Sequence, residues 1–504
     1  MRTKKTFYNV VSELVFQIVA FVCGLVFPRL VLESYGSAYN GVIQTIIQFV
    51  GYISILTMGV AGPTRVAIYK ALADKDDHKV NAVLKANDLF MRKVALALVG
   101  YMLVLAVVYP YMVREAFSWW EVALLVVIIG MGELAEYLFG NTSRILLGAH
   151  QESYVYMMLL TGSKIVSTIS AAILIINGFS IHAVRLAMVA SFAAAPIITN
   201  IYVRRKYHIR RDVEPDFSAL EQRGDAVAHS LADIVSKYVG MFLLAVLTNP
   251  VVVSVYSVYS LILDNLLKVQ KAFTNNLEAA FGNIWARNEK DIFVERLGTL
   301  EYLMFSFLLL VYTTTGSLIL PFMRLYTKGI HDANYILPMF AALFVASTAA
   351  YSLRDPYIVA VQAAGRYKQT RRLATREAIL NAAVSFVGVL ALGINGIVIG
   401  ALVANLYRTI GYAWYIYRDM LDIPITQFVK RWVWMLGSGF LIVALQLLTI
   451  RYLITIDSWF HWVLAGVACV AVAAGILLIS SVVFYRQELR KSVQMVKTML
   501  GKAS

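Results

Sequence analysis

The chain alternates between apolar stretches of about twenty to thirty residues and short polar connections. A helix of about 20 apolar residues is long enough to cross the hydrocarbon core of a bilayer. About fourteen stretches reach that length. They are 8–32, 40–69, 86–113, 118–147, 153–177, 180–204, 226–248, 250–280, 296–321, 334–363, 373–394, 396–417, 429–454 and 459–485. The pattern therefore predicts an all-α polytopic membrane protein with about fourteen transmembrane helices, numbered here in that order.

Composition adds an orientation to this picture. Apolar residues make up 60% of the chain, the mean hydropathy is +0.69 and the formal net charge is +15. The basic residues gather in alternate connections, at 70–85, 204–211 and 366–372, and in the tail. Because cytoplasmic loops carry an excess of Lys and Arg, these connections and both termini are predicted to be cytoplasmic. Topology thus accounts for the positive charge, and no nucleic-acid partner is expected.

A recurring pattern indicates two related halves. Gln151 precedes a helical hairpin that is predicted to turn at Asn177-Gly178. Gln369 precedes a second hairpin, predicted to turn at Asn395-Gly396 after the same spacing. An even number of spans keeps the orientation, so the halves are expected to be parallel repeats about the membrane normal. The predicted divisions are an N-terminal six-helix lobe (1–212), a C-terminal six-helix lobe (213–425) and an appended pair of helices, 13 and 14, with a cytoplasmic tail (426–504).

Polar side chains inside the spans are the candidate functional residues. A charge at the centre of a transmembrane helix costs roughly 2.5–3.5 kcal/mol on insertion scales, so it usually faces protein or a water-filled cavity. In span 8, Ser257, Ser260, Asp264, Lys268 and Lys271 form one polar stripe. Further candidates are Gln44 and Gln48 in span 2, Arg65 near its inner end, Lys164 in span 5, Lys237 in span 7, Arg354 in span 10, which is predicted to break at Arg354-Asp355-Pro356, and Arg408 in span 12. The functional interpretation is a hydrated cavity between two bundles, lined by cations.

A structural interpretation stands beside the functional one for two of these groups. Asp264 with Lys268, and Asp233 with Lys237, have the acid-first i,i+4 spacing of a helix ion pair. Each pair is as well explained by helix stability as by substrate contact.

Three acids are candidates for ion coupling. Glu133 and Glu136 in span 4 cannot both ionise cheaply at mid-depth, and Asp233 lies inside span 7. Hydrogen bonds between packed helices are the simpler explanation for the two glutamates.

Several functional classes lack their sequence signals. The chain has no G-x-x-x-x-G-K-[ST] loop and no H-E-x-x-H motif, and its seven histidines are scattered. The 2 cysteines, Cys23 and Cys469, lie inside apolar stretches, so no disulfide framework is expected. The sequence therefore predicts neither a cofactor nor a metal, and the protein is not expected to be an enzyme.

Three segments resemble a known family. They are FPRLVLESYGSAYNGVIQTIIQFVGYISILTMGVAGPTRVAIYK (27–70), VVSVYSVYSLILDNL (252–266) and GRYKQTRRLATREAILNAAVSFVGVLALGINGIVIGALVANLYRTIGY (365–412). They resemble bacterial polysaccharide flippases, the O-antigen and capsule repeat-unit exporters of the multidrug/oligosaccharidyl-lipid/polysaccharide (MOP) superfamily. The resemblance covers most of spans 1–12.

The resemblance implies two lobes around a central cavity that opens alternately to either side of the bacterial cytoplasmic membrane. The implied substrate is an oligosaccharide on undecaprenyl pyrophosphate, and the implied partners are membrane lipids and the pathway's polymerase and glycosyltransferases. Family cavities commonly use basic residues of spans 1, 2, 7 and 8. Span 1 offers only Arg29 near its outer end, whereas the other three offer Arg65, Lys237 and Lys268.

Two other functions stay open at this point. A multidrug or organic-cation exporter of the same superfamily would favour acidic residues in its site, whereas this chain has an excess of deep Lys and Arg. A membrane enzyme or scaffold of cell-surface glycan synthesis would usually need a large loop outside the membrane, and the hydropathy pattern predicts none. The sequence therefore favours a flippase for lipid-linked oligosaccharide.

Overall fold

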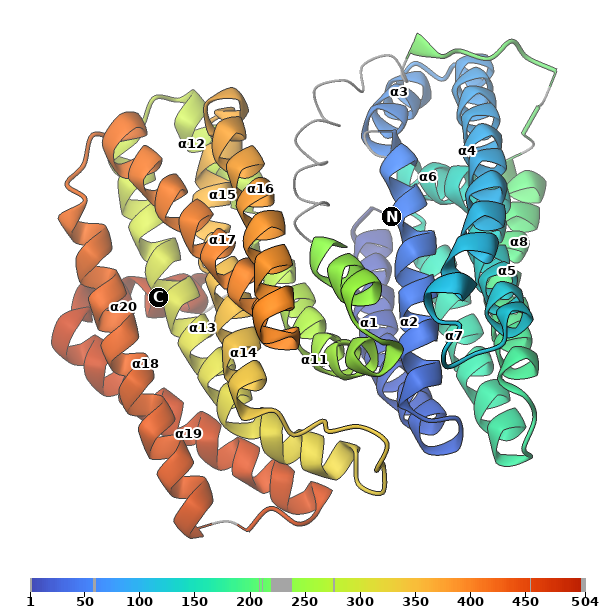
Figure 1. Cartoon of the computed structure of the whole chain (residues 1–504). Coiled ribbons are helices and arrows are strands. Elements are labelled where there is room, and N and C mark those ends of the chain that lie inside the picture. Colours follow the sequence, from blue (N-terminus) through green and yellow to red (C-terminus); the bar gives the residue numbers. More distant parts are fainter. Residues whose placement is uncertain are drawn as a thin grey trace. The chain divides into compact units, whose positions relative to one another are not determined.

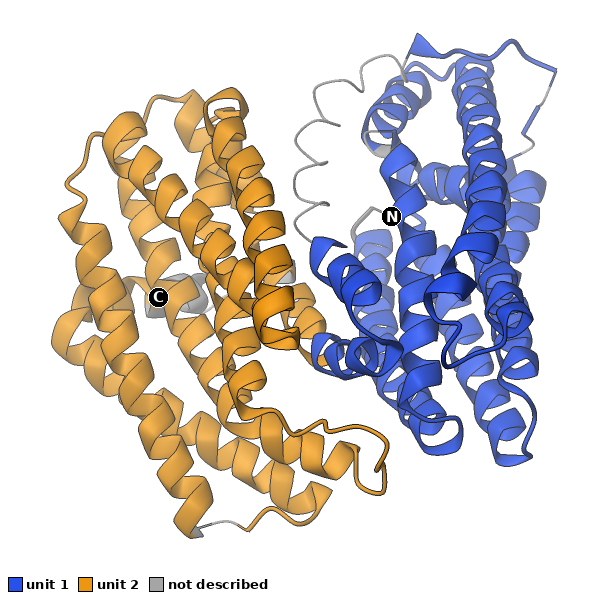
Figure 2. Ribbon diagram, in the orientation of Figure 1, with its two compact units in different colours: residues 1–261 blue, residues 262–504 orange. Residues whose placement is uncertain are grey.

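The computed structural model describes residues 2–57, 60–207, 209–210, 212–218, 238–274, 277–453 and 455–499. These residues form a succession of helices, which confirms the all-α prediction (Figure 1). They divide into two compact units, Met1–Leu261 and Ile262–Ser504 (Figure 2). The lobe boundaries near 212 and 425 stay a prediction.

The helices of unit 1 follow the predicted spans closely. They are α1 (Arg2–Ser34), α2 (Ser37–Gly51), η1 (Tyr52–Thr57), α3 (Ala61–Ala73), α4 (Asp77–Met112), α5 (Trp119–Ala135), η2 (Glu136–Gly140), α6 (Asn141–Ala149), α7 (Ser153–Ile176) and α8 (Ile181–Tyr207), followed by a short apolar helix, Tyr238–Leu247. The next helix, α11 (Pro250–Thr274), begins in unit 1 and ends in unit 2.

Unit 2 contains the remaining helices. They are α12 (Leu277–Ala286), α13 (Lys290–Tyr326), α14 (Pro338–Ser352), α15 (Asp355–Ala363), α16 (Tyr367–Leu392), α17 (Ile394–Trp414), η3 (Tyr415–Met420), α18 (Thr426–Leu453), α19 (Trp459–Phe484) and α20 (Arg486–Met499).

In the described part of the chain, 12 helices are long and apolar enough to cross a membrane. Two predicted spans are not among them. The span at 226–248 falls largely outside the described residues, and its described part is the short helix Tyr238–Leu247. The span at 334–363 is divided into α14 and α15 at the predicted break, where Pro356 has no N–H to continue the helical ladder.

Helix packing in unit 1 is fastened at one end by a buried acid. Glu152, between α6 and α7, accepts hydrogen bonds from Lys5 of α1 (2.8 Å) and Tyr207 of α8 (2.8 Å) and pairs with Lys206 (2.5 Å). Burial raises the pKa of this carboxyl, but the hydrogen bonds from Lys206, Lys5 and Tyr207 outweigh burial and lower the pKa to about 2. The cluster joins α1 and α8, which both pack against α7.

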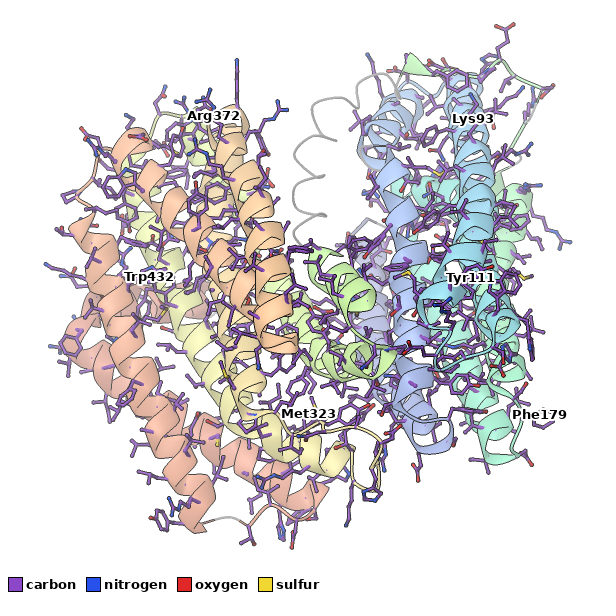
Figure 3. All side chains as sticks on the ribbon, in the orientation of Figure 1. Lys93, Tyr111, Phe179, Met323, Arg372 and Trp432 are labelled. Atoms are coloured by element: carbon purple, nitrogen blue, oxygen red, sulfur yellow. The ribbon has the colours of Figure 1, made fainter. Side chains whose placement is uncertain are left out.

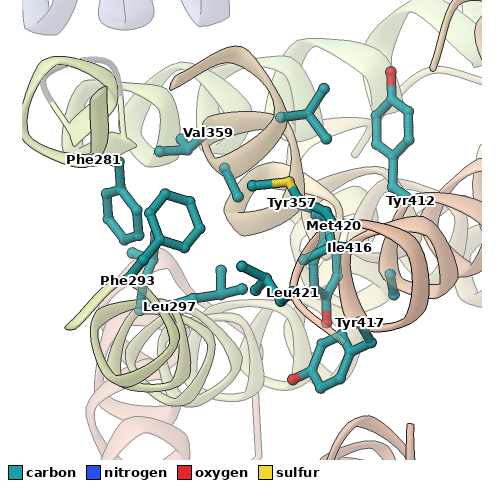
Figure 4. Close-up of a cluster of buried hydrophobic side chains, with 14 of the residues drawn as sticks. Phe281, Phe293, Leu297, Tyr357, Val359, Tyr412, Ile416, Tyr417, Met420 and Leu421 are labelled. Atoms are coloured by element: carbon teal, nitrogen blue, oxygen red, sulfur yellow. The ribbon is translucent and has the colours of Figure 1, made fainter. Parts of the chain in front are cut away.

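The apolar core of unit 2 is rich in aromatic rings (Figure 4). Phe281 of α12 and Phe293 of α13 meet edge to face with ring centroids 5.2 Å apart, a favoured arrangement for aromatic pairs. Tyr357 of α15 and Tyr417 of η3 both pack against Phe428 of α18. This core joins α12, α13, α15, η3 and α18.

The closest helix contact in unit 2 runs between α16 and α17 through glycines. A Cβ on Gly396 would overlap the backbone of Gly388, and one on Gly400 would overlap Ser385. Small residues allow such close approach where the hydrophobic effect cannot drive helix association. The predicted turn at Asn395-Gly396 is wrong by two residues, because the chain turns at Gly393 and both residues lie in the first turn of α17. Gly393 has φ 57°, a conformation that a side chain disfavours.

The order of elements supports the predicted repeat. Helices α6 and α15 are both nine residues long, and the second begins 214 residues after the first (355 against 141). Helix α16 likewise begins 214 residues after α7 (367 against 153). In both halves a short helix follows an interruption, and a residue with positive φ, Gln151 or Gly365, precedes the next long helix. The predicted pairing of Gln151 with Gln369 is therefore displaced by four residues from the spacing of 214 that relates the two halves.

The glycine contact gives the first prediction. Gly396→Ala should destabilise the protein by about 1–3 kcal/mol, because the added methyl group has no room beside Gly388. Thermal unfolding in detergent, followed by tryptophan fluorescence, measures the change. Gly475→Ala in α19 is the matched control, since a Cβ there meets nothing within 4 Å. Equal unfolding temperatures for the two variants would contradict the close contact.

Candidate functional site

Three buried charges of unit 2 form a triad of two arginines and one glutamate. Glu377 of α16 accepts from Arg354 Nη1 through Oε1 (2.7 Å) and from Arg408 Nη1 of α17 through Oε2 (2.6 Å). All three side chains are at most 2% exposed. Arginine stays protonated in proteins, so the triad holds one net positive charge inside a helix bundle.

Aromatic side chains complete the surroundings of the two guanidinium groups. The Arg354 guanidinium lies over the ring of Tyr351, 3.8 Å from its centroid. Arg408 donates a second hydrogen bond, from Nη2 to the hydroxyl of Tyr412 (3.0 Å). Cation–π contacts gain strength where water is excluded, so both rings help to hold the surplus charge.

A second polar chain runs from α11 to the break between α14 and α15. Gln270 donates to Asp355 Oδ2 (2.8 Å) and to the backbone oxygen of Ser352 (3.1 Å). The Ser352 hydroxyl in turn hydrogen bonds the hydroxyl of Tyr312 on α13 (2.8 Å). These hydrogen bonds satisfy some of the polar groups at the helix break within the protein, as a lipid environment requires.

The stripe on α11 brings exposed cations to this network. Lys271 donates to the hydroxyl of Tyr351 (3.2 Å), the ring that also contacts Arg354. Lys268, one turn earlier, is exposed and lies 3.4 Å from Asn265 Oδ1, and Asp264 is exposed as well. Positive charge therefore extends from the surface of α11 to the interior of unit 2. Substrate contact by Lys268 and Asp264 stays a prediction.

Arg354 and Arg408 were predicted from their depth alone, and the structure brings them together on one acid. Glu377 itself was missed, because it follows Arg371, Arg372 and Arg376 in what reads as a cytoplasmic charged segment. Arg354 and Arg408 lie deep in their spans and have no acid one turn away in sequence, so each needed an acidic partner from another span. That need was the only hint of Glu377 in the sequence. Substrate contact by either arginine stays a prediction.

A further buried ion pair ties α18 to α13. Arg431 pairs with the fully buried Glu301, and Tyr417 of η3 donates to Glu301 Oε2 (2.8 Å). Sequence reasoning did not identify this pair. Because this cluster is closed on itself, its geometry is that of a structural tie.

In unit 1, the predicted acids lie at an irregular turn of span 4. Glu136 begins the π-helical segment η2, accepts from the hydroxyl of Tyr156 (2.8 Å) and lies 3.7 Å from Arg144 Nη1. Glu133, three residues earlier, is exposed. Single π-helical turns are frequent at functional sites, and this one begins at Glu136, three residues after Glu133. The hydrogen bond from Tyr156 supports the packing explanation for Glu136, and ion coupling stays a prediction.

The other predicted contacts are dispersed. Gln44 and Gln48 are half-buried on α2, Lys164 is half-buried on α7, and Arg65 is exposed on α3. Asn40 of α2 donates to Ser254 Oγ of α11 (2.8 Å), which joins the polar stripes of spans 2 and 8 inside unit 1. Lys237 and Asp233 lie outside the described residues.

One buried cation of unit 1 was missed by sequence reasoning. Arg185 of α8 is 7% exposed, its Nε and Nη2 have no hydrogen-bond partner among the described residues, and its guanidinium lies 4.5 Å from the ring centroid of Phe27. A lone buried arginine in a membrane-spanning helix is a functional candidate by default. The signal in the sequence was one Arg in the interior of span 6, five residues from its start.

Long apolar helices that enclose a few buried charged clusters define an all-α, multi-pass membrane protein. Its structure is similar to that of the lipid II flippase MurJ in an inward closed conformation, with a TM-score of 0.68 and 14% identity over 95% of this chain and 99% of that one. It is also similar to multidrug resistance MATE family transporters of the MOP superfamily. An inward-facing one has a TM-score of 0.54 and 13% identity over 82% of this chain and 95% of that one. An outward-facing one has a TM-score of 0.54 and 16% identity over 83% and 97%.

No protein-family model and no curated protein sequence matches the chain. At 13–16% identity the structural likeness shows the fold. The fold is therefore the one shared by MurJ and the MATE transporters.

The triad gives the second prediction. Glu377→Gln should destabilise the protein by roughly 3–5 kcal/mol, because it leaves two buried guanidinium groups without a countercharge. Thermal unfolding in detergent and the amount of protein in the membrane both report the loss. The control is Glu295→Gln, which removes an exposed pair with Lys491 and should change neither measurement noticeably. If the Glu377→Gln protein were as stable as the control, the triad would not contribute to stability as described.

Proposed function

We propose that the protein moves undecaprenyl-pyrophosphate-linked oligosaccharide from the cytoplasmic to the outer leaflet by alternating access. The observation that supports this most is the net positive, membrane-embedded network of unit 2 in a fold shared with a lipid II flippase over 95% of the chain. A pyrophosphate that leaves water needs Lys or Arg to compensate its charge. Glycan needs hydrogen-bonding side chains, and the chain has 29 Tyr.

Export of organic cations is the second candidate, because the MATE transporters of similar fold are described as multidrug resistance proteins. A site for a cation is stabilised by unpaired carboxylates. In the described part of unit 2, the buried carboxylates Glu377 and Glu301 are paired with arginine, and the buried Asp355 accepts a hydrogen bond from Gln270. The charge balance favours an anionic substrate.

The proposed setting follows from the same function. The protein would lie in the bacterial cytoplasmic membrane with both termini in the cytoplasm. Its product would be consumed by a glycan polymerase, and its substrate supplied by glycosyltransferases. The acids Glu133, Glu136 and Asp233 are the candidates for coupling to an ion, and Lys237, Lys164, Arg65, Gln44 and Gln48 remain candidate substrate contacts.

The third prediction concerns Lys268, the exposed cation at the middle of the α11 stripe. Lys268→Ala should abolish glycan export while membrane abundance stays unchanged, because an exposed side chain contributes little to packing. Lys268→Arg should preserve part of the export, since charge is the required property. Surface glycan on intact cells measures export, and immunoblotting of membranes measures abundance.

Lys290→Ala is the control, an exposed lysine at the start of α13 away from the stripe, and it should export normally. Normal export by Lys268→Ala would remove this lysine from the site. If Asp264→Asn restored export to Lys268→Ala, the two residues would act as an ion pair and not as a substrate contact.

The fourth prediction tests orientation with the two ends of α8. Arg205 and Phe179 are both exposed, whereas the native Cys23 and Cys469 are buried. Arg205→Cys should resist a membrane-impermeant thiol reagent in intact cells and react after permeabilisation. Phe179→Cys should react in intact cells. The opposite pattern would reverse the proposed topology and place the basic loops outside.

A further inference from the structure

A pocket opens at the basic end of unit 1, separate from the network of unit 2. Its volume is about 240 Å³, and its polar lining includes Lys85, Asp88 and Arg92 of α4, Arg204 of α8 and Arg210. Figure 3 shows Lys93 near this end of the unit and Phe179 near the other. Among the described lining residues, four cations from three chain segments thus surround one space with a single acid.

The polar atoms of the pocket suit an anion with several oxygens. Thr142 and Ser143 of α6 add hydroxyl groups, and Asn200 is fixed by donating to Ser143 Oγ (3.2 Å) and the Phe139 backbone oxygen (3.1 Å). Lys85 is held by the backbone oxygen of Val213 (2.7 Å). No described residue pairs with the guanidinium groups of Arg92 and Arg210, so both are available to a ligand. A guanidinium group can donate two parallel N–H hydrogen bonds to two oxygens of one phosphate.

The helix faces beside the pocket indicate what else the ligand carries. On α4, Leu96 and Leu103 continue the face of Arg92 and are 74% and 62% exposed. On α8, Ile197 and Ile201 precede Arg204 on its face and are also exposed. Because α4 leaves the basic end and α8 returns to it, both apolar faces extend from the pocket in the same direction. A phosphate in the pocket would therefore carry apolar chains alongside it.

We propose that this pocket binds the phosphate group of an anionic diacyl phospholipid, with the acyl chains along the exposed faces of α4 and α8. The basic end is the one predicted to be cytoplasmic, where anionic lipids attract basic pockets between transmembrane helices. The site is independent of the proposed transport activity, and its occupancy is measurable without transport. A lipid held here would fasten α4, α6 and α8 of unit 1 together.

The test uses the full-length protein, purified in detergent, and native mass spectrometry to count bound lipids. Phosphatidylglycerol should bind about tenfold more tightly than phosphatidylcholine, which has no net charge. The double variant Arg92→Gln/Arg210→Gln should lose about that factor for phosphatidylglycerol and little for phosphatidylcholine. The control Arg371→Gln/Arg372→Gln removes two exposed cations of α16 and should bind phosphatidylglycerol as the unmodified protein does. Equal affinities for both double variants would overturn the proposal.

Two further arms identify the source of the phosphate. An excess of glycerol 1-phosphate should not displace the lipid, and displacement would assign the pocket to a soluble phosphate compound. Undecaprenyl phosphate should compete no better than phosphatidylglycerol. If it displaced phosphatidylglycerol at lower concentration, and only with Arg92 and Arg210 present, the pocket would belong to the transported lipid and the proposed occupant would be wrong.

A variant that should change the lipid affinity in the opposite direction keeps the proposal testable if the arginine variants misfold. Asp88→Asn keeps every cation and removes the only acid among the described lining residues, so it should tighten phosphatidylglycerol binding several-fold. Thermal unfolding without lipid checks that each variant is folded. If Arg92→Gln/Arg210→Gln fails this check, Asp88→Asn decides, and unchanged lipid affinity in that variant would overturn the proposal.

Discussion

Glu377 is the countercharge of two buried arginines. Its two oxygens separately accept from Arg354 and Arg408, so one side chain joins the N-terminus of α15 to α16 and α17. The break between α14 and α15 places Arg354 beside this carboxylate. From there the polar chain reaches Tyr351, Lys271 and the surface of α11. The polar interior of unit 2 is thus arranged around one carboxylate.

Such contacts matter more in lipid than they would in water. Lipid chains are as apolar as leucine, so burying apolar side chains against each other gives little net drive for helices to associate. In unit 2, close packing at the glycines holds α16 against α17. Charge pairing in the Glu377 and Glu301 clusters holds further helices together. In unit 1, Glu152 has the same role for α1 and α8. Each unit is therefore held by a few specific contacts in addition to its aromatic and aliphatic core.

Much of the fold could be read from the sequence, because hydrophobic length and turn residues act locally. The long apolar helices, the turn at Asn177-Gly178 and the break before Pro356 follow from such signals. The turn at Gly393 was misplaced because Asn-Gly is also a strong turn signal, whereas here Gly396 serves helix contact. The partners of the buried charged residues could not be predicted from the sequence. Glu377 and Glu301 pair with arginines that are 23 to 130 positions away, and no local spacing encodes such a separation. Arg185 and the pocket near Arg92 likewise depend on contacts between distant helices.

The unequal composition of the triad has an electrical consequence. Two guanidinium groups and one carboxylate leave one elementary charge inside the membrane-spanning part of unit 2. Moving one charge across a full membrane potential of 100 mV changes the free energy by about 2.3 kcal/mol. A displacement of the triad along the membrane normal would therefore change the free energy by a fraction of that amount. A potential that is negative inside would draw the triad inward. An anionic substrate moving outward would be driven by the same field, so voltage would act on the protein and its cargo in opposite directions.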